Sequence, residues 1–462
     1  MKAVILKQTG PPSEVIALTP DAPTPKRAPG DILVRVIASA VNPVEYKTVR
    51  GMLPAKVPKV RGRERERGER DGGGGAEVGE AGADAGIDEK NSRKIAGGAR
   101  PRPPPACPLR RPSRAAAGGR PRWRPPRPPR SPPCRPGHPL GCKHGQQDAL
   151  PALPATTRAG AGLSRALSLL HPHTRLAPPL QILAGDVAGI VVEADPDGPF
   201  QPGTPVFAMT DGFKWDVDEH GCWAEYVSFP AAWAAAAPSS IPLADAAALP
   251  LVALTAYQTL ALAPNLKKVE EGGSGPAAPP RILVHAGAGG VGHVGVQLAR
   301  ALYGAEVTST AGPANQAFLK AEPLGVDEAV DYKAVSPDEF AKSHAGAFDA
   351  ILDVVGGAQG EATAGALLKL GGTYCHVFNT ATDGETTAKV KAALEAEGKA
   401  YVGPTLVSPD GPALAAIAAL VDAGKLKPII ASRVALDGVA AALEEVEAGH
   451  VRGKIVVEVA KE

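Results

Sequence analysis

The hydrophobic pattern of residues 282–378 alternates between short apolar runs and longer amphipathic stretches. The short runs are rich in β-branched residues and bounded by glycine, which is typical of strands buried on both faces. We expect such strands at residues 282–284, 306–310, 328–331, 348–355 and 371–378. Because Ala/Leu-rich helical stretches separate them, the sequence predicts an α/β fold with a doubly wound parallel sheet of Rossmann type.

The two ends of the chain have a different pattern. Residues 1–60 and 182–250 are strand-like and rich in turns, whereas residues 243–263 favour a helix that leads into the parallel sheet. Near the C-terminus, residues 435–449 predict one more helix before a final strand at residues 454–459. These ends therefore fit a second domain that is richer in strands.

A glycine-rich turn joins the first predicted strand to its helix, in the stretch ILVHAGAGGVGHVGVQLAR. Gly287, Gly289 and Gly292 have the G-x-G-x-x-G spacing, which permits a tight turn, admits a pyrophosphate and lets helix and strand pack closely. An apolar stripe at helical spacing follows, formed by Val291, Val294, Leu298 and Leu302. Because a helix N-terminus attracts phosphate, the turn predicts a dinucleotide site. The alternative is a merely flexible turn.

The end of the second predicted strand bears on the choice of dinucleotide. An acidic residue there would bond the ribose 2′-hydroxyl of NAD. Glu306 has about the expected spacing, but it opens the strand and would lie about 13 Å from the carboxyl end. The end itself, from Thr310 to Pro313, contains no carboxylate. We therefore expect NADP(H) rather than NAD(H).

Length and composition exclude several classes of protein. The 462 residues suffice for two or three domains, and no apolar run approaches the roughly 18 residues of a membrane span. The start, MKAVILKQTG, goes straight into an apolar strand without a signal-like leader. Five scattered cysteines fit a reducing compartment. We expect a cytoplasmic protein, the alternative being internal targeting to the chloroplast.

The net charge of +2 combines two different segments. Residues 61–181 contain 23 Lys and Arg against 10 Asp and Glu, whereas the remainder contains 27 against 38. The segment includes RGRERERGERDGGGG and a Pro/Arg tract near residues 121–139. Because it has too few apolar residues to form a core, we expect a disordered insert. Its flanks read as a loop running into a strand, so the insert divides one domain.

Three interpretations of this insert stay open. A retained intron or faulty gene model would explain a composition that is foreign to both flanks. A genuine basic arm would bind nucleic acid or an acidic surface. Zinc ligation is the third interpretation, although the C-x3-H-x3-C-x-H spacing of its candidate ligands matches no common site. Those candidates are Cys134, His138, Cys142 and His144.

Eight motifs lie along the rest of the chain in a specific order. They are VNPVEYKTVRG (41–51), GDVAGIVVEA (185–194), GCWAEYVSFP (221–230), LPLVALTAYQTL (249–260), HAGAGGVGHVGVQLAR (285–300), VDYK (330–333), FDAILDVVGG (348–357) and RGKIVVEV (452–459). This order resembles the medium-chain dehydrogenase/reductase superfamily, especially its zinc-independent quinone oxidoreductase branch. Plant enone reductases and the chloroplast-envelope quinone oxidoreductase homologue belong to that branch. The resemblance covers essentially all of residues 1–60 and 182–462.

The resemblance implies two domains with the active-site cleft at their junction. A GroES-like β-barrel catalytic domain would comprise residues 1–60, 182–255 and 429–462, around a Rossmann NADP-binding domain at residues 256–428. A homodimer is a further expectation. Zinc-dependent members have a Cys where Asn42 stands and a His where Gly185 stands, so the resemblance implies that no metal is bound.

Without a Lewis acid, alcohol oxidation loses its usual means of activation. Hydride transfer from a nicotinamide to an electron-poor C=C bond or quinone needs only a hydrogen-bond donor at the carbonyl oxygen. We therefore expect an NADPH-dependent reductase of α,β-unsaturated carbonyls (enones or enals) or quinones. The alternatives are a carbonyl reductase or trans-acting enoyl reductase of the same fold, and an NADPH-binding protein without turnover whose basic insert holds RNA.

The same resemblance implies the catalytic residues. Asn42, Tyr46 and Lys47 would approach the nicotinamide and the substrate, with Lys47 on the ribose or substrate oxygen and Tyr46 as a proton donor. The family usually has Asp where Glu45 stands. The alternative is that Asn42 only caps a turn and that Lys47 is a solvated surface charge.

The remaining expectations concern the cofactor. The candidate cofactor-binding residues are Thr255, Gly287, Gly289, Gly290, Val291, Gly292, Thr310, Tyr332, Val355 and Gly356. Thr255 could instead be a helix N-cap. Lys320 or Lys333 could bring positive charge to the adenosine 2′-phosphate. We expect His285 and His293 to be structural, because nothing near them in the sequence would orient an imidazole.

Overall fold

The computed structural model of the chain describes residues 1–53, 181–212, 220–269, 278–377 and 384–461. These residues all belong to one compact unit, Met1–Glu64 with Thr174–Glu462. The predicted insert at residues 61–181 lies outside the described residues, except for Gln181. No helix among the described residues is both long and apolar enough to cross a bilayer.

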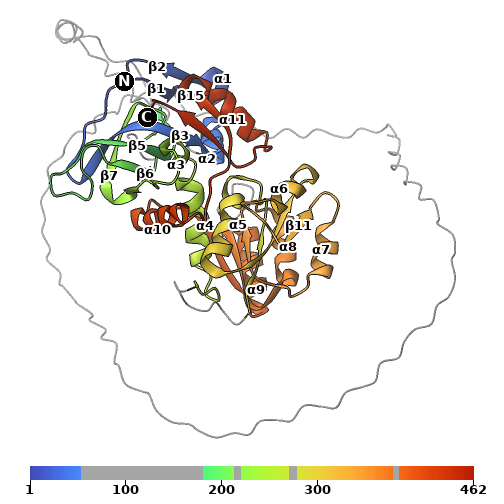
Figure 1. The fold of residues 1–462 in the computed structure, drawn as a ribbon. Helices are drawn as coiled ribbons and strands as arrows, with labels where there is room; N and C mark the ends of the chain where they lie inside the picture. Colours follow the sequence, from blue (N-terminus) through green and yellow to red (C-terminus); the bar gives the residue numbers. More distant parts are fainter. Residues whose placement is uncertain (54–180, 213–219, 270–277, 378–383, 462) are drawn as a thin grey trace, which may run out of the picture. The chain divides into compact units, whose positions relative to one another are not determined.

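A six-stranded parallel sheet forms in the second half of the chain (Figure 1). Its strands are β9 (Arg281–Val284), β10 (Glu306–Ala311), β11 (Glu328–Asp331), β12 (Phe348–Asp353), β13 (Leu368–Val377) and β14 (Ala400–Thr405). The order β11-β10-β9-β12-β13-β14 is that of a dinucleotide-binding Rossmann sheet, so the predicted doubly wound fold is confirmed. The strand order reverses between β9 and β12, where such sheets bind their ligands.

Helices connect these strands. They are α5 (Gly290–Tyr303), η2 (Pro313–Asn315), α6 (Gln316–Lys320), α7 (Pro337–Ser343), α8 (Ala358–Leu367) and α9 (Gly384–Ala396). The strand predicted at residues 348–355 ends two residues early, at Asp353. It ends there because the Asp353 carboxylate accepts hydrogen bonds from the N–H groups of Val355 and Gly356 and bends the chain.

Two further sheets contain the remaining strands, which pair antiparallel except for the parallel pair β15 and β16. A seven-stranded sheet is formed by β3 (Asp31–Val41), β5 (Asp186–Glu193), β6 (Pro205–Met209), β7 (Tyr226–Pro230), β8 (Ala234–Ala236), β15 (Ile430–Ala435) and β16 (Lys454–Glu458). A smaller sheet is formed by β1 (Ala3–Leu6), β2 (Ile16–Thr19) and β4 (Gln181–Ile182). The C-terminal strand β16 pairs with β3, so both chain ends build one sheet. The exact domain boundaries stay predictions.

Helices also lie beside these sheets. They are α1 (Pro12–Val15), α2 (Pro43–Val49), η1 (Ala231–Trp233), α3 (Leu243–Ala246), α4 (Pro250–Ala261), α10 (Gly411–Asp422), η3 (Leu436–Gly438) and α11 (Val439–Glu447). The single helix expected at residues 243–263 is therefore two helices. Pro250 separates them, because proline lacks an N–H and fits only the first turn of a helix.

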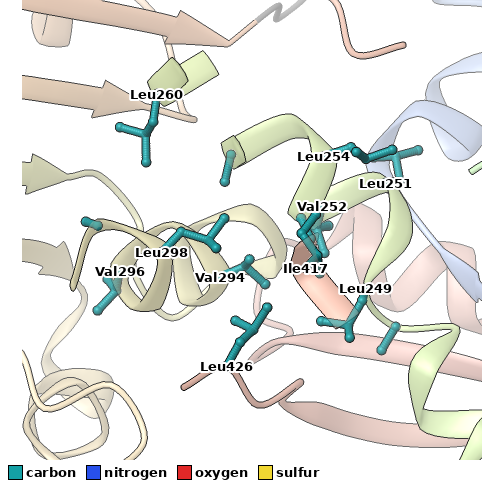
Figure 2. Packing of buried hydrophobic residues seen from close by; sticks show 14 of the residues in the cluster. Leu249, Leu251, Val252, Leu254, Leu260, Val294, Val296, Leu298, Ile417 and Leu426 are labelled. Atoms are coloured by element: carbon teal, nitrogen blue, oxygen red, sulfur yellow. The ribbon is translucent and has the colours of Figure 1, made fainter. Parts of the chain in front are cut away.

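The largest hydrophobic cluster packs α4 against α5 and α10 (Figure 2). Val294 and Leu298 from the predicted apolar stripe are fully buried in it. Gln297, which lies off that stripe, is buried as well. Its side-chain amide donates to the Lys427 carbonyl and accepts from the Lys427 N–H, so it connects α5 to the segment after α10.

Candidate functional site

The glycine turn between β9 and α5 uses each glycine differently. A Cβ on Gly287 would lie 2.1 Å from the Ser309 hydroxyl oxygen, and one on Gly292 would lie 2.1 Å from the Ala286 carbonyl oxygen. These two glycines therefore permit close packing of the turn. Gly289 differs, because the nearest atom to its Cβ position is 3.3 Å away. The open side of Gly289 is available to a ligand at the N-terminus of α5, where the first helical N–H groups have no intrahelical acceptor.

A cavity of about 230 Å³ lies against this turn. Gly289, Gly290, Val291 and Gly292 line one side of it. Residues distant in sequence line the rest, including Asn42, Leu251, Val354 and Lys454. The structure thus brings the predicted cofactor turn and one predicted catalytic residue, Asn42, to one cavity.

Asn42 belongs to a buried polar cluster of four side chains, which are Asn42, Glu45, Asp186 and Lys454. Each is at most 3% exposed. Lys454 Nζ donates to the Val41 carbonyl at 2.9 Å and to Asn42 Oδ1, and lies 3.3 Å from Asp186 Oδ2. The cluster joins β3, α2, β5 and β16, so it fixes one wall of the cavity.

The amide hydrogens of Asn42 are directed into this cluster. Asn42 Nδ2 donates to Asp186 Oδ2 at 2.8 Å and to Glu45 Oε1 at 3.2 Å. The backbone N–H of Asn42 donates to Glu45 Oε2, which starts α2. Asn42 therefore lines the cavity with both amide hydrogens already engaged by Asp186 and Glu45.

Glu45 is the acidic residue that differs from the family's usual Asp. Complete burial raises its pKa to about 7, with Asp186 adding to the rise, while Lys454 and the hydrogen bonds from Asn42 oppose it. The carboxyl therefore exchanges its proton near neutral pH. This places a titrating group beside the wall of the cavity.

Tyr46 and Lys47, the other two catalytic candidates, do not line the cavity beside the glycine turn. Both side chains are partly buried on α2. Burial lowers the pKa of Lys47, and its ammonium makes no hydrogen bond or ion pair with a described residue. Burial raises the pKa of Tyr46, with the Glu447 charge adding to the effect. Their predicted catalytic roles stay predictions.

A second cavity, of about 470 Å³, lies at the carboxyl ends of β9 to β12. The predicted residues Thr310, Tyr332, Val355 and Gly356 line it, and Ala286 lines both cavities. Its other walls are largely apolar and aromatic, formed by Val330, Val335, Pro337, Phe340 and Leu367. Thr310 helps to fix the turn, because its hydroxyl oxygen accepts from the Ala286 N–H at 3.1 Å.

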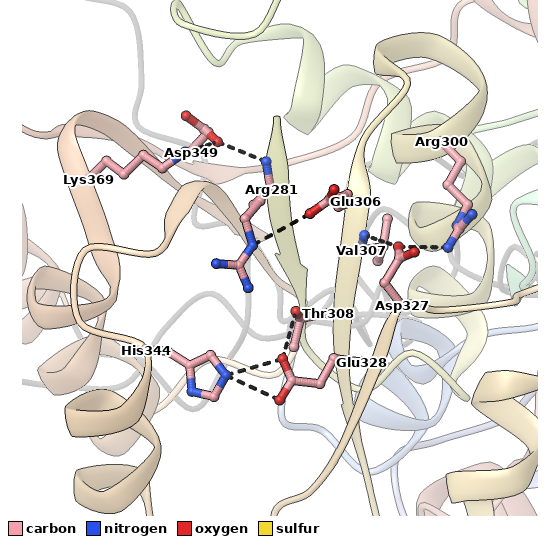
Figure 3. A network of polar contacts seen from close by, with 10 residues as sticks. All are labelled: Arg281, Arg300, Glu306, Val307, Thr308, Asp327, Glu328, His344, Asp349 and Lys369. Carbon is pink, nitrogen blue, oxygen red and sulfur yellow. Dashed lines mark hydrogen bonds and ion pairs between the residues drawn. The ribbon is translucent and has the colours of Figure 1, made fainter. Parts of the chain in front are cut away.

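The end of β10 faces two residues that follow β11. The Cβ position of Gly312 lies 3.9 Å from a ring carbon of Tyr332 and 4.0 Å from Lys333 Cε. Of the two lysines considered for the adenosine 2′-phosphate, Lys333 is thus the one whose side chain approaches Gly312 at the carboxyl end of β10. Glu306 begins β10 at the opposite edge, and its carboxylate lies 3.9 Å from Arg281 Nε (Figure 3). The expectation that Glu306 lies away from the carboxyl end is confirmed.

Three other candidates have local roles. Thr255 lies inside α4, where its hydroxyl donates to the Leu251 carbonyl at 2.7 Å, so it is not an N-cap. Fully buried His293 donates from Nδ1 to the Gly289 carbonyl and accepts at Nε2 from the Ile429 N–H. These partners require the neutral ring, and burial lowers its pKa to about 4. His285 lines the second cavity, and burial lowers its pKa.

Sequence reasoning missed Lys454, Asp186 and Asp353 as site residues. All three lie inside the quoted motifs, but the residues directly before and after each of them are apolar or glycine. A buried charge within a strand is costly unless it is paired, and that cost was the available signal. Among the described residues, no three His, Cys, Asp or Glu side chains gather to hold a metal ion.

Comparisons with known proteins agree with this geometry. A family model described as zinc-binding dehydrogenase matches residues 324–457, which include neither Asn42 nor Gly185. The mitochondrial NAD(P)H oxidoreductase RTN4IP1 of Mus musculus is 33% identical over 305 residues, which is 63% of this chain and 73% of that protein. The chloroplast envelope quinone oxidoreductase homolog of Arabidopsis thaliana is 33% identical over 278 residues, 60% of this chain and 79% of that protein.

A solved structure supports the fold independently. The quinone oxidoreductase from Coxiella burnetii superimposes with a TM-score of 0.60 over 99% of each chain, at 23% sequence identity. Fold, site geometry and sequence relatives therefore lead to one conclusion. The chain belongs to the medium-chain dehydrogenase/reductase superfamily, in the branch of the quinone oxidoreductase homologues.

Proposed function

We propose that this protein is an NADPH-dependent reductase that transfers hydride to an α,β-unsaturated carbonyl or a quinone. The observation that carries the proposal is the pair of adjoining cavities on either side of Ala286. One is lined by the glycine turn and the other lies at the carboxyl ends of β9 to β12, as a dinucleotide across a Rossmann switch point requires. The relatives named above as NAD(P)H and quinone oxidoreductases support it.

The residues present fit such a cofactor. Gly289 leaves main chain open at the N-terminus of α5, which suits a pyrophosphate. When bound, the nicotinamide supplies the hydride. Val354 and Leu251 of the cavity wall would exclude water from it, and the wall held by Lys454 and Asp186 would orient it. Lys47 remains the candidate that contacts a substrate or ribose oxygen, with Tyr46 as proton donor.

The preference for NADPH rests on the end of β10. Tyr332 and Lys333 approach Gly312 there, and the nearby Asp331 carboxylate is engaged, accepting from the Lys333 N–H at 3.0 Å. The 2′-phosphate of NADPH would meet the Lys333 ammonium, whereas the ribose 2′-hydroxyl of NADH would find no carboxylate acceptor on β10 itself. Titration with both coenzymes tests this proposal, and NADH binding as tightly as NADPH would refute it.

A substrate panel tests the activity. The full chain should oxidise NADPH in the presence of simple enones, enals or quinones, as followed by absorbance. Lys47→Ala should lower turnover at least tenfold while NADPH binding stays detectable, and the exposed Lys7→Ala is the matched control. NADPH binding without turnover on any of these substrates would favour a nucleotide-binding protein instead.

The compartment is also a proposal. The sequence predicted a cytoplasmic protein with chloroplast targeting as the alternative, and relatives carry mitochondrial and chloroplast names. Microscopy of the tagged full chain would decide between these compartments.

A further inference from the structure

The Asp353 carboxylate is folded back onto the chain that follows it. Asp353 is the last residue of β12 and is 1% exposed. Its Oδ1 accepts from the N–H groups of Val355 and Gly356, each at 2.8 Å. Its Oδ2 accepts from the hydroxyl of Tyr374, a fully buried residue of the neighbouring strand β13, at 2.5 Å. Both carboxylate oxygens are therefore engaged within the protein.

The turn held by Asp353 lies between the two cavities. Val354 lines the smaller cavity beside the glycine turn, whereas Val355 and Gly356 line the larger one. Gly356 and Gly357 have φ values of +67° and +99°, which are conformations that side chains rarely adopt. The turn thus has an unusual backbone path, and the carboxylate holds it through the N–H groups of Val355 and Gly356.

The charge of Asp353 is unexpected at this place. Burial raises its pKa, but His285, the Tyr374 hydroxyl and the two amides outweigh burial and hold the pKa below its ordinary value. Burial raises the pKa of Tyr374, with Asp353 adding to the effect, so its hydroxyl stays a donor. An ionised carboxylate therefore lines the cavity in which a polyanionic cofactor would bind, where simple electrostatics disfavours it.

We propose that Asp353 and Tyr374 form a positioning pair that sets the spacing between the two cavities. The pair would hold the 354–356 turn so that both halves of one dinucleotide fit at the same time. This inference rests on the proposed binding of NADPH. The negative charge of Asp353 by itself would repel the cofactor, so electrostatics alone predicts tighter binding when the charge is removed. The positioning role predicts weaker binding instead.

The test compares NADPH with 2′,5′-ADP, which can fill only the adenosine side. In Asp353→Asn and in Tyr374→Phe, the dissociation constant of NADPH should rise about tenfold, because the turn is no longer held in place and binding must offset a cost similar to that of one charge-assisted hydrogen bond. The dissociation constant of 2′,5′-ADP should change less than about twofold. Tyr374→Phe keeps the charge, so it separates positioning from electrostatics and serves if the first variant does not fold.

Asp349→Asn is the matched control. Asp349 lies on the same strand, but its carboxylate pairs with Lys369 and with the Arg281 N–H (Figure 3). This variant should bind both ligands as the unmodified chain does. Tighter NADPH binding by Asp353→Asn, equal losses for both ligands, or lowered thermal stability with unchanged binding would each overturn the inference. Failure of the unmodified chain to bind NADPH would instead overturn the proposed function, and the inference with it.

Discussion

Lys454 and Asp186 form an ion pair inside the protein, with Nζ 3.3 Å from Oδ2 and with 3% and 0% of their side chains exposed. The two residues are 268 positions apart, on the last strand and on β5. A third charged group, the Glu45 carboxyl, belongs to the same cluster through Asn42. The pair therefore connects the last strand to β5 at the wall of the proposed cofactor site.

Removing Lys454 should destabilise the protein strongly. Lys454→Met leaves Asp186 buried without its cation, which typically costs about 3–5 kcal/mol of unfolding free energy. Urea denaturation measures this loss. Lys389→Met is the control, because Lys389 and its partner Glu385 are 74% and 79% exposed and should contribute no measurable stability. Equal stability of the two variants would contradict the burial of the pair.

The pH dependence of stability should contain two opposed contributions. The Glu45 pKa rises from 4.5 to about 7 on folding, so the folded state binds more protons in this range and stability falls as pH rises. The His293 pKa falls from 6.5 to about 4, so the unfolded state binds more protons and stability rises with pH. Each contribution is about 3 kcal/mol in total.

Substitution separates these two contributions. In Glu45→Gln, stability between pH 4.5 and 6.5 should rise with pH, because the Glu45 contribution is removed and the His293 contribution is kept. In His293→Asn the slope should become less positive over the same range, because the Glu45 contribution remains and the lowered pKa values of His285 and His376 are left to oppose it. Urea denaturation at several pH values checks both slopes, and an unchanged slope in either variant would refute the corresponding assignment.

The glycines of the turn should differ in what their substitution disturbs. Gly292→Ala places a methyl group 2.1 Å from the Ala286 carbonyl oxygen and should cost about 1–3 kcal/mol of stability. In Gly289→Ala the Ala286 carbonyl oxygen lies 3.3 Å from the new Cβ, so the loss of thermal stability should be smaller than in Gly292→Ala while NADPH affinity falls. Calorimetry and fluorescence titration measure the two effects. Normal NADPH binding by Gly289→Ala would place the pyrophosphate elsewhere.

Lys333 should decide the preference for the 2′-phosphate. In Lys333→Ala, the dissociation constant of NADPH should rise about tenfold, since a charge-assisted hydrogen bond to phosphate is lost. NADH binding should stay unchanged. Lys320→Ala is the control, because Lys320 is exposed on α6 and, unlike Lys333, is not among the nearest neighbours of the Gly312 Cβ position. Equal losses for NADPH and NADH in the Lys333 variant would contradict this role.

The sequence alone determined the parallel sheet and its glycine turn. Of the five strands predicted, β11 has its observed bounds and the others differ by one to three residues at one or both ends, because short β-branched runs between helical stretches have few other solutions. Gly289 was identified as open main chain from its spacing. Glu306 was correctly expected at the start of its strand, away from the carboxyl end where an acidic residue could bond a ribose, because residue order along a strand sets the distance directly. These features depend on neighbours close in the chain.

Only the tertiary structure decided how the wall of the site is held. Asn42 was predicted to approach the nicotinamide and the substrate, and the structure shows that its amide hydrogens bond Glu45 and Asp186. Asp353 and Tyr374 meet only because β12 and β13 are neighbours in the sheet. A lone charge in an apolar strand must find a partner, but sequence order does not say which, since the partners lie tens or hundreds of residues away and meet only on folding.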